Sequence, residues 1–340
     1  MTRRKLGIVG CGPRGRAYAA VIGSIESAEL CLCIDPDLQT ARACAALYGG
    51  DVSETWDAPM LDGVIVTTPH DARRANLVVA AMNSGIPVLL DPPLSFGVLE
   101  ARRLVRAAAR AGRRLLMAFT WRFEPIMGLI HTLLPEPMFG HMLSMSPRYK
   151  SEEWQLDQDD SRYRSWATVH HALDLLAYLF GEAPDQILVA GKTPRPGSEF
   201  GLGDSLAAEL FFNEGRHAAL TVAAAPGTGD LGDVVVDLSD GNTRASLWSN
   251  WSHAEIRALD GRALTVPPVP GIEIEHHNET VLIKARDSEY ALRASIRALV
   301  DGSDLDEMWP GSVDGLRAAI LARALHSAIV SGRRQTLRGL

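Results

Sequence analysis

The stretch Lys5-Leu-Gly-Ile-Val-Gly-Cys-Gly-Pro-Arg-Gly-Arg16 decides the fold of this chain. It begins as a short buried strand, passes through three glycines with the spacing GxGxxG, and continues into a helical pattern. This strand–turn–helix context is what a dinucleotide-binding loop requires, because a glycine triplet alone recurs by chance. The first glycine permits the tight turn, the second lets the backbone approach a pyrophosphate, and the third lets helix and strand pack closely. The predicted cofactor loop comprises Gly10, Cys11, Gly12, Pro13, Arg14 and Gly15.

The next predicted strand, residues 29–35, ends in Asp35, about twenty residues after Gly15. At this position the dinucleotide fingerprint expects an acid that binds the ribose hydroxyls. A carboxylate there would repel a 2′-phosphate, and Pro36 follows where an NADP site more often has Ser or Arg. The pattern therefore favours NAD over NADP as cofactor. An ordinary turn or helix-capping role for Asp35 is the open alternative.

Outward from this loop, short apolar strands alternate with amphipathic helices until about residue 121, which predicts a parallel sheet. Further strands are expected at 62–69, 86–91 and 113–121, and helices at 15–25, 37–49, 72–85 and 99–112. We therefore predict a Rossmann domain with a doubly wound parallel sheet over residues 1–120.

After residue 121 the pattern changes to that of an α+β domain, residues 121–340, with a large, mainly antiparallel open sheet. Helices are expected at 121–134 and 167–181, a strand at 141–150, a surface loop at 151–161, strand-like segments from 186 to about 283, and closing helices at 290–300 and 311–332.

Composition excludes several classes of partner. The net charge of −7 and the pI near 5.8 argue against nucleic acids and anionic membranes. No segment has the roughly 18–20 apolar residues that cross a bilayer, and the apolar run 6–9 is too short for a signal peptide.

The thiols point to a reducing compartment. The four cysteines, Cys11, Cys31, Cys33 and Cys44, are expected to be buried reduced thiols rather than a disulfide or metal site, so a cytoplasmic location is expected. The pair His276-His277 has no matching ligand cluster, and no metal is predicted.

Four further segments carry a family resemblance. Thr68-Pro69-His70 follows a strand, IPVLLDPPL spans residues 86–94, AFTWRFEP spans 118–125, and HALDLLAYLFGE spans 171–182. In this order they resemble the TPN, VLCEKPL-like, GFNRRFDP and HxxDxxxxLxGE segments of the Gfo/Idh/MocA oxidoreductases, over nearly the whole chain. The resemblance implies a C-terminal sheet that carries a small-molecule substrate on one face and often mediates oligomerisation on the other, hence a homodimer or homotetramer. It places Thr68, Pro69, His70, Asp91, Pro92 and Arg122 at the cofactor, with Arg122 alternatively orienting a loop and Asp91 acting as an acid or holding its loop.

The chain departs from the family where members that oxidise sugars or cyclitols carry catalytic groups. The EKP triplet is Asp91-Pro92-Pro93, and Ala167 replaces the first aspartate of the DxGxHxxD motif, so of three catalytic groups only His171 remains. A lysine relays the alcohol proton during hydride transfer, whereas proline and alanine exchange no proton. We therefore expect that the usual polyol dehydrogenase mechanism does not operate.

The remaining proton donor candidate is His171, with Asp174 one helical turn later on the same face. Alternatively His171 only packs beneath the cofactor. Weaker candidates are Tyr149, Lys150, Tyr163 and Arg164.

The function expected from these residues is an NAD-dependent oxidoreductase with altered acid–base groups, acting on a keto-sugar, a cyclitol derivative or a related biosynthetic intermediate, as a carbonyl or imine reductase. The main alternative is a catalytically inert dinucleotide-binding sensor or partner protein. A third, weaker alternative is chemistry without net redox change, such as elimination after transient oxidation.

Overall fold

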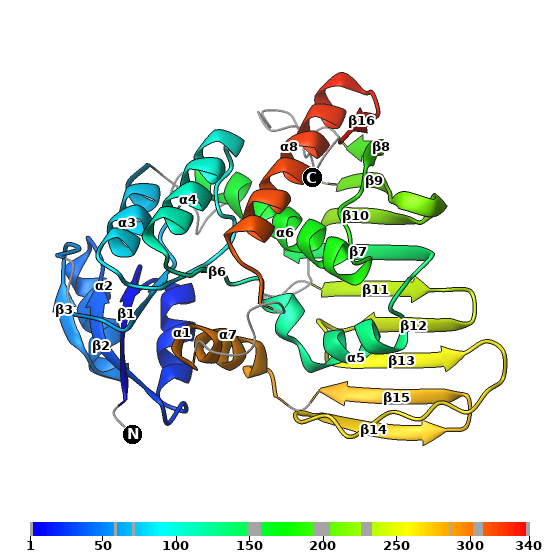
Figure 1. Cartoon of the computed structure of the whole chain (residues 1–340), viewed down its shortest axis with the longest axis horizontal. Helices are drawn as coiled ribbons and strands as arrows, with labels where there is room; N and C mark the ends of the chain where they lie inside the picture. Colours follow the sequence, from blue (N-terminus) through cyan, green and yellow to red (C-terminus); the bar gives the residue numbers. More distant parts are fainter. Residues whose placement is uncertain are drawn as a thin grey trace. The chain divides into compact units, whose positions relative to one another are not determined.

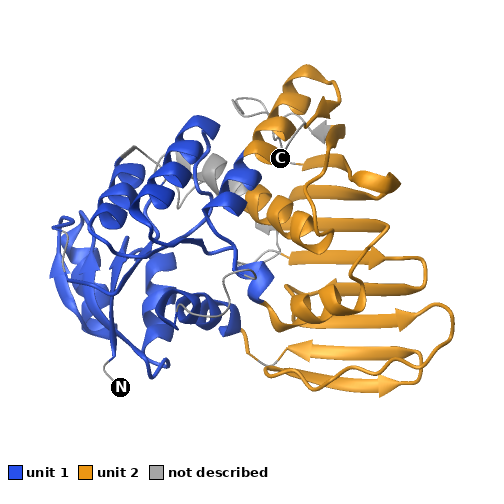
Figure 2. Cartoon of the chain, viewed as in Figure 1, with its two compact units in different colours: residues 1–123, 289–319 blue, residues 124–288, 320–340 orange. Residues whose placement is uncertain are grey.

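The computed structural model describes residues 3–57, 60–69, 72–147, 158–193, 205–225, 233–285, 287–301 and 309–337. The chain forms two compact units (Figure 2). Unit 1 contains residues 1–123 and 289–319, and unit 2 contains residues 124–288 and 320–340. The units are therefore not continuous in sequence, in contrast to the single division at residue 120 that the sequence pattern suggests.

Unit 1 is built on a six-stranded parallel sheet with the strand order β3-β2-β1-β4-β5-β6 (Figure 1). This is the doubly wound dinucleotide-binding order, in which ligands bind at the carboxyl ends of the strands. Its elements are β1 (Arg4–Val9), α1 (Pro13–Ile22), β2 (Ala28–Ile34), α2 (Leu38–Tyr48), β3 (Asp51–Ser53), β4 (Gly63–Val66), α3 (Ala72–Asn83), β5 (Val88–Leu90), α4 (Val98–Ala111), β6 (Leu115–Met117), the 3₁₀ helix η1 (Thr120–Phe123) and α7 (Tyr290–Asp301).

Two apolar cores cover the two faces of this sheet. Alternate strand residues enter opposite cores: Ile65 packs with α1, α2 and α7, whereas Val64 and Val66 pack with α3 and α4. Because both faces are covered, the strands are continuous apolar runs rather than alternating ones. Helix α7 belongs to this unit because Ile296 and Leu299 pack in the same core as Ile65.

Unit 2 is built on a ten-stranded sheet with the order β14-β15-β13-β12-β11-β7-β10-β9-β8-β16 (Figure 1). Among the described strands of this second sheet, only β7 and β10 pair in parallel. Its elements are α5 (Pro125–Leu133), β7 (Phe139–Pro147), α6 (Gln158–Leu179), β8 (Gln186–Thr193), β9 (Ser205–Phe211), the 3₁₀ helix η2 (Asn213–Gly215), β10 (His217–Ala225), β11 (Asp233–Ser239), β12 (Thr243–Trp248), β13 (His253–Ala258), β14 (Ile272–His277), β15 (Thr280–Ala285) and β16 (Gln335–Thr336). Helix α8 (Ser312–Ser331) begins in unit 1 and ends in unit 2.

The fold class predicted from sequence is confirmed in both parts, the parallel Rossmann sheet and the large, mainly antiparallel one. Several local predictions differ from the structure. The strand expected at 113–121 covers only Leu115–Met117, because Thr120–Phe123 form η1. The expected loop 151–161 is already helical from Gln158, and residues 151–157 lie outside the described part of the chain. The expected helix 121–134 is divided at Glu124, because Pro125 occupies the first turn of a new helix.

Candidate functional site

The glycine loop between β1 and α1 is held by close backbone contacts. Gly10 has a φ of +93°, and a Cβ there would lie 2.9 Å from the backbone nitrogen of Thr68. A Cβ on Gly15 would lie 1.9 Å from the carbonyl oxygen of Gly10. The Thr67 hydroxyl donates to that same carbonyl at 2.7 Å. The loop can therefore close this tightly only with glycine at both positions.

Gly12 differs from the other two glycines because a Cβ there would meet nothing within 4 Å. It is the N-cap of α1, no side chain caps the helix, and Pro13 begins the first turn. No capping side chain therefore accepts a hydrogen bond from the first N–H groups of α1. Unpaired N–H groups and the positive end of the helix dipole form an anion site, which fits the pyrophosphate of a dinucleotide.

Asp35 lies at the carboxyl end of β2, half-buried beside the loop. Its Oδ2 accepts from the backbone N–H of Cys11 at 2.8 Å, and its Oδ1 accepts from that of Asp37 at 2.9 Å. These two bonds hold the carboxylate next to the glycines. Of the two alternatives for Asp35, helix capping is performed by Asp37, which accepts from the backbone of Gln39 and the hydroxyl of Thr40. The turn alternative stays open, because the bond from the Asp37 N–H to Asp35 is the side-chain bond of a turn.

The ends of β4 and β5 are joined by Arg74, a buried residue of α3. Its guanidinium donates to the carbonyl oxygen of Thr68 at 3.3 Å and to that of Asp91. The hydroxyl oxygen of Thr68 is buried without a hydrogen-bond partner among the described residues, so it is a polar group that a ligand could satisfy. Pro69 is exposed, and His70 lies outside the described residues.

The partner of Asp91 is not predictable from the sequence pattern. Arg14 of the glycine loop donates from Nε to Asp91 Oδ1 at 2.8 Å and lies over the ring of Tyr18. Although burial acts in the opposite direction, the Asp91 carboxylate raises the pKa of Arg14, so the guanidinium stays charged. Pro92, at the position of the family lysine, is buried. The end of β5 therefore carries the Arg14–Asp91 ion pair, and the role of Asp91, as an acid or as the residue that holds its loop, stays a prediction.

Arg122 is engaged elsewhere in unit 1. Its side chain is 8% exposed, and its guanidinium donates to Asp314 at 3.1 Å. Burial disfavours the Asp314 carboxylate, but the charges of Arg122 and Arg317 outweigh it and lower the pKa of Asp314. This arrangement corresponds to the predicted alternative in which Arg122 orients a loop, and its contact with cofactor stays a prediction.

In unit 2, the predicted proton donor His171 is half-buried on α6. Asp174, one turn later, is 1% exposed, as is His170. Tyr163 and Arg164 lie on α6 with side chains outside the described part, and Tyr149 and Lys150 are not described at all. The structure therefore places His171 and Asp174 on one helix, and their roles stay predictions.

A further titratable group in unit 2 has no counterpart in the sequence reasoning. Burial, together with the charge of Asp287, raises the pKa of Glu124 to about 8. Glu124 is the N-cap of α5, directly after the Arg122-Phe123 pair. A carboxyl with this pKa is mostly protonated at pH 7. Neither its position before Pro125 nor its charge distinguishes it in the sequence.

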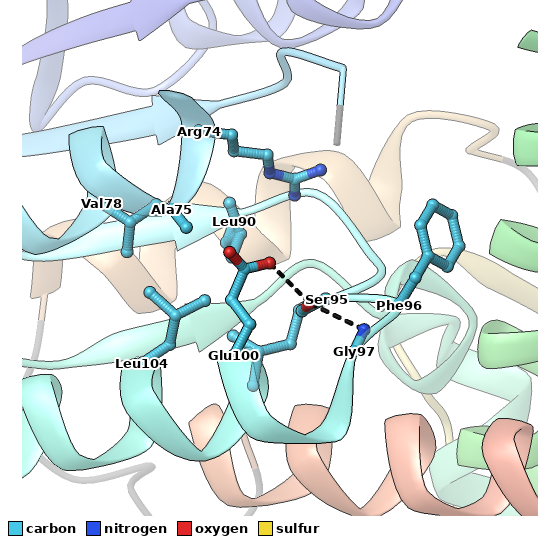
Figure 3. Close-up of a pocket in the computed structure, with 10 residues that line it drawn as sticks. Arg74, Ala75, Val78, Leu90, Ser95, Phe96, Gly97, Glu100 and Leu104 are labelled. Atoms are coloured by element: carbon cyan, nitrogen blue, oxygen red, sulfur yellow. Dashed lines mark hydrogen bonds between the residues drawn. The ribbon is translucent and has the colours of Figure 1, made fainter. Parts of the chain in front are cut away.

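A small cavity of about 100 Å³ in unit 1 is lined by residues of α3, β5 and α4 (Figure 3). Arg74, Ser95 and Glu100 are its polar lining, with Ser95 donating to Glu100 at 2.7 Å. Ser95 also accepts from the Gly97 N–H at 3.0 Å, so this network closes the start of α4. None of the residues predicted for the cofactor site lines this cavity.

Comparison with known proteins gives a family for the N-terminal part. Residues 4–119 match the sequence model GFO_IDH_MocA, described as "Oxidoreductase family, NAD-binding Rossmann fold". The chain is 27% identical over 192 residues to glucose-6-phosphate 3-dehydrogenase of Bacillus subtilis, covering 52% of this chain and 54% of that protein. It is 32% identical over 191 residues to inositol 2-dehydrogenase 4 of Saccharopolyspora erythraea, covering 54% and 56%. The matches thus span little more than half the length of these relatives.

Solved structures match over the whole chain. UDP-N-acetylglucosamine 3-dehydrogenase of Acidithiobacillus ferrooxidans superposes with a TM-score of 0.75 at 21% identity, covering 96% of this chain and 98% of that one. An oxidoreductase domain protein of Kribbella flavida superposes with a TM-score of 0.78 at 18% identity, covering 100% of both chains. At these identities the likeness establishes the shared fold.

Proposed function

We propose that this protein, whose Rossmann domain belongs to the Gfo/Idh/MocA family of NAD-binding oxidoreductases, reduces a carbonyl or imine of a keto-sugar, a cyclitol derivative or a related biosynthetic intermediate. The observation that carries the proposal is the glycine loop. Gly12 leaves the start of α1 open to a pyrophosphate, and Asp35 is held beside it by the Cys11 N–H.

Bound NADH would supply the hydride. The open end of α1 would hold its pyrophosphate, and Asp35 would accept from the hydroxyls of the adenosine ribose. A 2′-phosphate at that ribose would meet the Asp35 carboxylate, which supports NAD rather than NADP as the cofactor.

The altered residues leave one acid–base group, His171, for the proton that accompanies hydride transfer, because Pro92 exchanges no proton. Arg14 and Asp91 form an ion pair at the end of β5. A carbonyl reductase needs one proton donor, and a protonated iminium needs none from the protein. We assign the donor role to His171, with Asp174 positioning its ring.

The substrate class is supported by the names of the relatives. Two of them act, by name, on glucose 6-phosphate and on inositol, both ring polyols. For this chain we propose a ring ketone or imine of similar size as substrate. A homodimer or homotetramer in the cytoplasm belongs to the same proposal, with neither nucleic acid nor membrane as partner. In the portion of the chain that the structure describes, no helix is both long and apolar enough to span a bilayer.

The first test is a fluorescence titration of the purified protein with NADH and NADPH in parallel. We expect NADH to bind at least tenfold more tightly than NADPH, which corresponds to about 1.4 kcal/mol. If neither NADH nor NADPH binds, the proposal loses its basis.

The proton donor role is tested by His171→Ala. We expect turnover to fall about 10²–10⁴-fold with unchanged NADH affinity, because general acid catalysis contributes about that much. His276→Ala, at an exposed position of β14, is the control and should keep full turnover. Unchanged turnover in His171→Ala would exclude the role.

A second candidate function is an inert dinucleotide-binding sensor or partner protein. Pro92 and Ala167, in place of the family's catalytic lysine and aspartate, favour it. The two functions are distinguished by whether ring ketones or imines ever oxidise bound NADH. For a sensor, NADH would change only the affinity for another protein.

A further inference from the structure

Three of the four cysteines converge in the core of unit 1. Cys11 comes from the glycine loop, Cys33 from β2 and Cys44 from α2, and their sulfur atoms all lie within 4.8 Å of one another. All three side chains are 0% exposed. Cys31, the fourth cysteine, is half-buried and contacts Glu29 instead. Three thiols from three separate elements thus face a common point.

Thiolate sulfur is a soft ligand that selects soft, thiophilic ions over Mg²⁺ or Ca²⁺. The surroundings of this cluster are apolar, with Ile8, Tyr18 and Ile22 in the same core. Toward backbone of the described residues, these sulfurs make weak and long hydrogen bonds, 3.7 Å from Cys11 to the Ile34 carbonyl and 3.7 Å from Cys33 to the Gly49 carbonyl. Losing two such weak donors on deprotonation is a small cost.

We propose that Cys11, Cys33 and Cys44 form a three-thiolate site for one trivalent thiophilic ion, with arsenous acid as the species that delivers it. The net charge of the ion and its three thiolates indicates the oxidation state of the ion. A trivalent centre with three thiolates is neutral, whereas a divalent or monovalent ion would leave net negative charge in an apolar core, which is costly. Asp35 and Arg16 act on this cluster with opposite signs, so neighbouring charge offsets little of that cost.

The binding step is an exchange without oxidation or reduction. As(OH)₃ reacts with three thiols to give As(S–Cys)₃ and three water molecules. Three As–O bonds break, three As–S bonds form, and each thiol proton leaves with a hydroxide as water. No further reactant is required. Because the sulfurs are fully buried, entry depends on local opening of α2 or the loop, so we expect slow uptake.

The test incubates the reduced full-length protein with arsenite and measures uptake by native mass spectrometry, with X-ray absorption to count sulfur neighbours. We expect one arsenic per chain, three protons displaced and three As–S bonds. Cys44→Ser should reduce arsenic affinity at least tenfold. Cys31→Ser is the matched control, since it removes a thiol outside the cluster, and should bind as the wild type does.

Thermal unfolding followed by circular dichroism verifies that each variant is folded, and Cys44→Ala replaces Cys44→Ser if the serine variant is not. The proposal is overturned if the wild type takes up no arsenic, if the Cys44 variant binds equally well, or if removing Cys31 abolishes uptake. Zinc is tested in parallel, and tighter binding of zinc than of arsenic would overturn the assignment to a trivalent ion.

Discussion

The structure gives different physical reasons for the glycines at positions 12 and 15. A side chain on Gly15 would meet backbone, the carbonyl oxygen of Gly10, whereas a side chain on Gly12 would extend into open space. One position therefore serves the fold, and the other leaves room for a ligand. A similar separation holds for Asp35, which faces the loop, and Asp37, which caps α2.

We predict that Gly12→Ala folds normally and loses NADH affinity at least tenfold. Its backbone, with φ −65° and ψ −170°, accepts alanine, and the new methyl group occupies the space proposed for the pyrophosphate. Gly15→Ala should instead lose about 2–3 kcal/mol of stability, because backbone has to move. Urea unfolding and NADH titration of both variants measure this. Wild-type NADH affinity in Gly12→Ala would place the cofactor elsewhere.

We predict that Asp35→Ser shifts the ratio of NADH to NADPH affinity at least tenfold toward NADPH. The change removes both the acceptor for the ribose hydroxyls and the charge that repels a 2′-phosphate. Asp37→Asn is the matched control: it removes one negative charge two residues away and retains an oxygen that caps α2. Parallel titrations measure both ratios, and an equal shift in the control would show a general charge effect.

Between elements, the carboxyl ends of β4 and β5 depend on side chains that come from other parts of the chain. Arg74 of α3 reaches the carbonyl oxygens that end both strands, and Arg14 of α1 reaches Asp91. These contacts fix the edge at which a doubly wound sheet binds its ligand.

We predict that Arg74→Met destabilises the protein by about 2–4 kcal/mol, because two part-buried carbonyl groups lose a charged donor. Methionine retains most of the apolar stem, so the effect isolates the guanidinium. Arg73→Met, at the exposed neighbouring position on the same helix, should change stability by less than about 0.5 kcal/mol. Chemical denaturation compares the two, and equal effects would contradict the role of Arg74.

The sequence predicts what is local. The glycine loop and the strand–helix alternation are enough to predict the parallel sheet. The change of pattern near residue 121 is enough to predict the second, mainly antiparallel sheet. The sequence does not predict which sheet a helix packs against. The apolar face of α7 indicates that the helix is packed, but not that Ile296 and Leu299 pack in unit 1. Contacts between distant residues, such as Arg14 with Asp91 or Cys11 with Cys33 and Cys44, also leave no periodic signal. The roles assigned to the site residues stay predictions.

At the scale of the whole molecule, the two faces of the ten-stranded sheet differ in what covers them. Helices α5 and α6 pack on one face. On the other face, directly paired residues such as Phe139, Ser239 and His217 are all partly exposed. A hollow of about 420 Å³ between β7, β11 and β12 lies there, lined in part by Phe139 and Asp237. Large apolar side chains exposed along a sheet are typical of an association surface.

We predict that the protein associates with a second copy through this face. Phe139 and Leu282 are 42% and 36% exposed on β7 and β15, and burying them would contribute to a stable interface. The double variant Phe139→Glu with Leu282→Glu should therefore be a monomer in analytical ultracentrifugation, at concentrations where the wild type is a dimer or tetramer. Leu99→Glu is the matched control, since Leu99 is an apolar residue 81% exposed on α4 in unit 1. A monomeric wild type, or dissociation caused equally by Leu99→Glu, would contradict an interface on the sheet. Retention of NADH binding by the double variant would show in addition that the dinucleotide site of unit 1 does not depend on association.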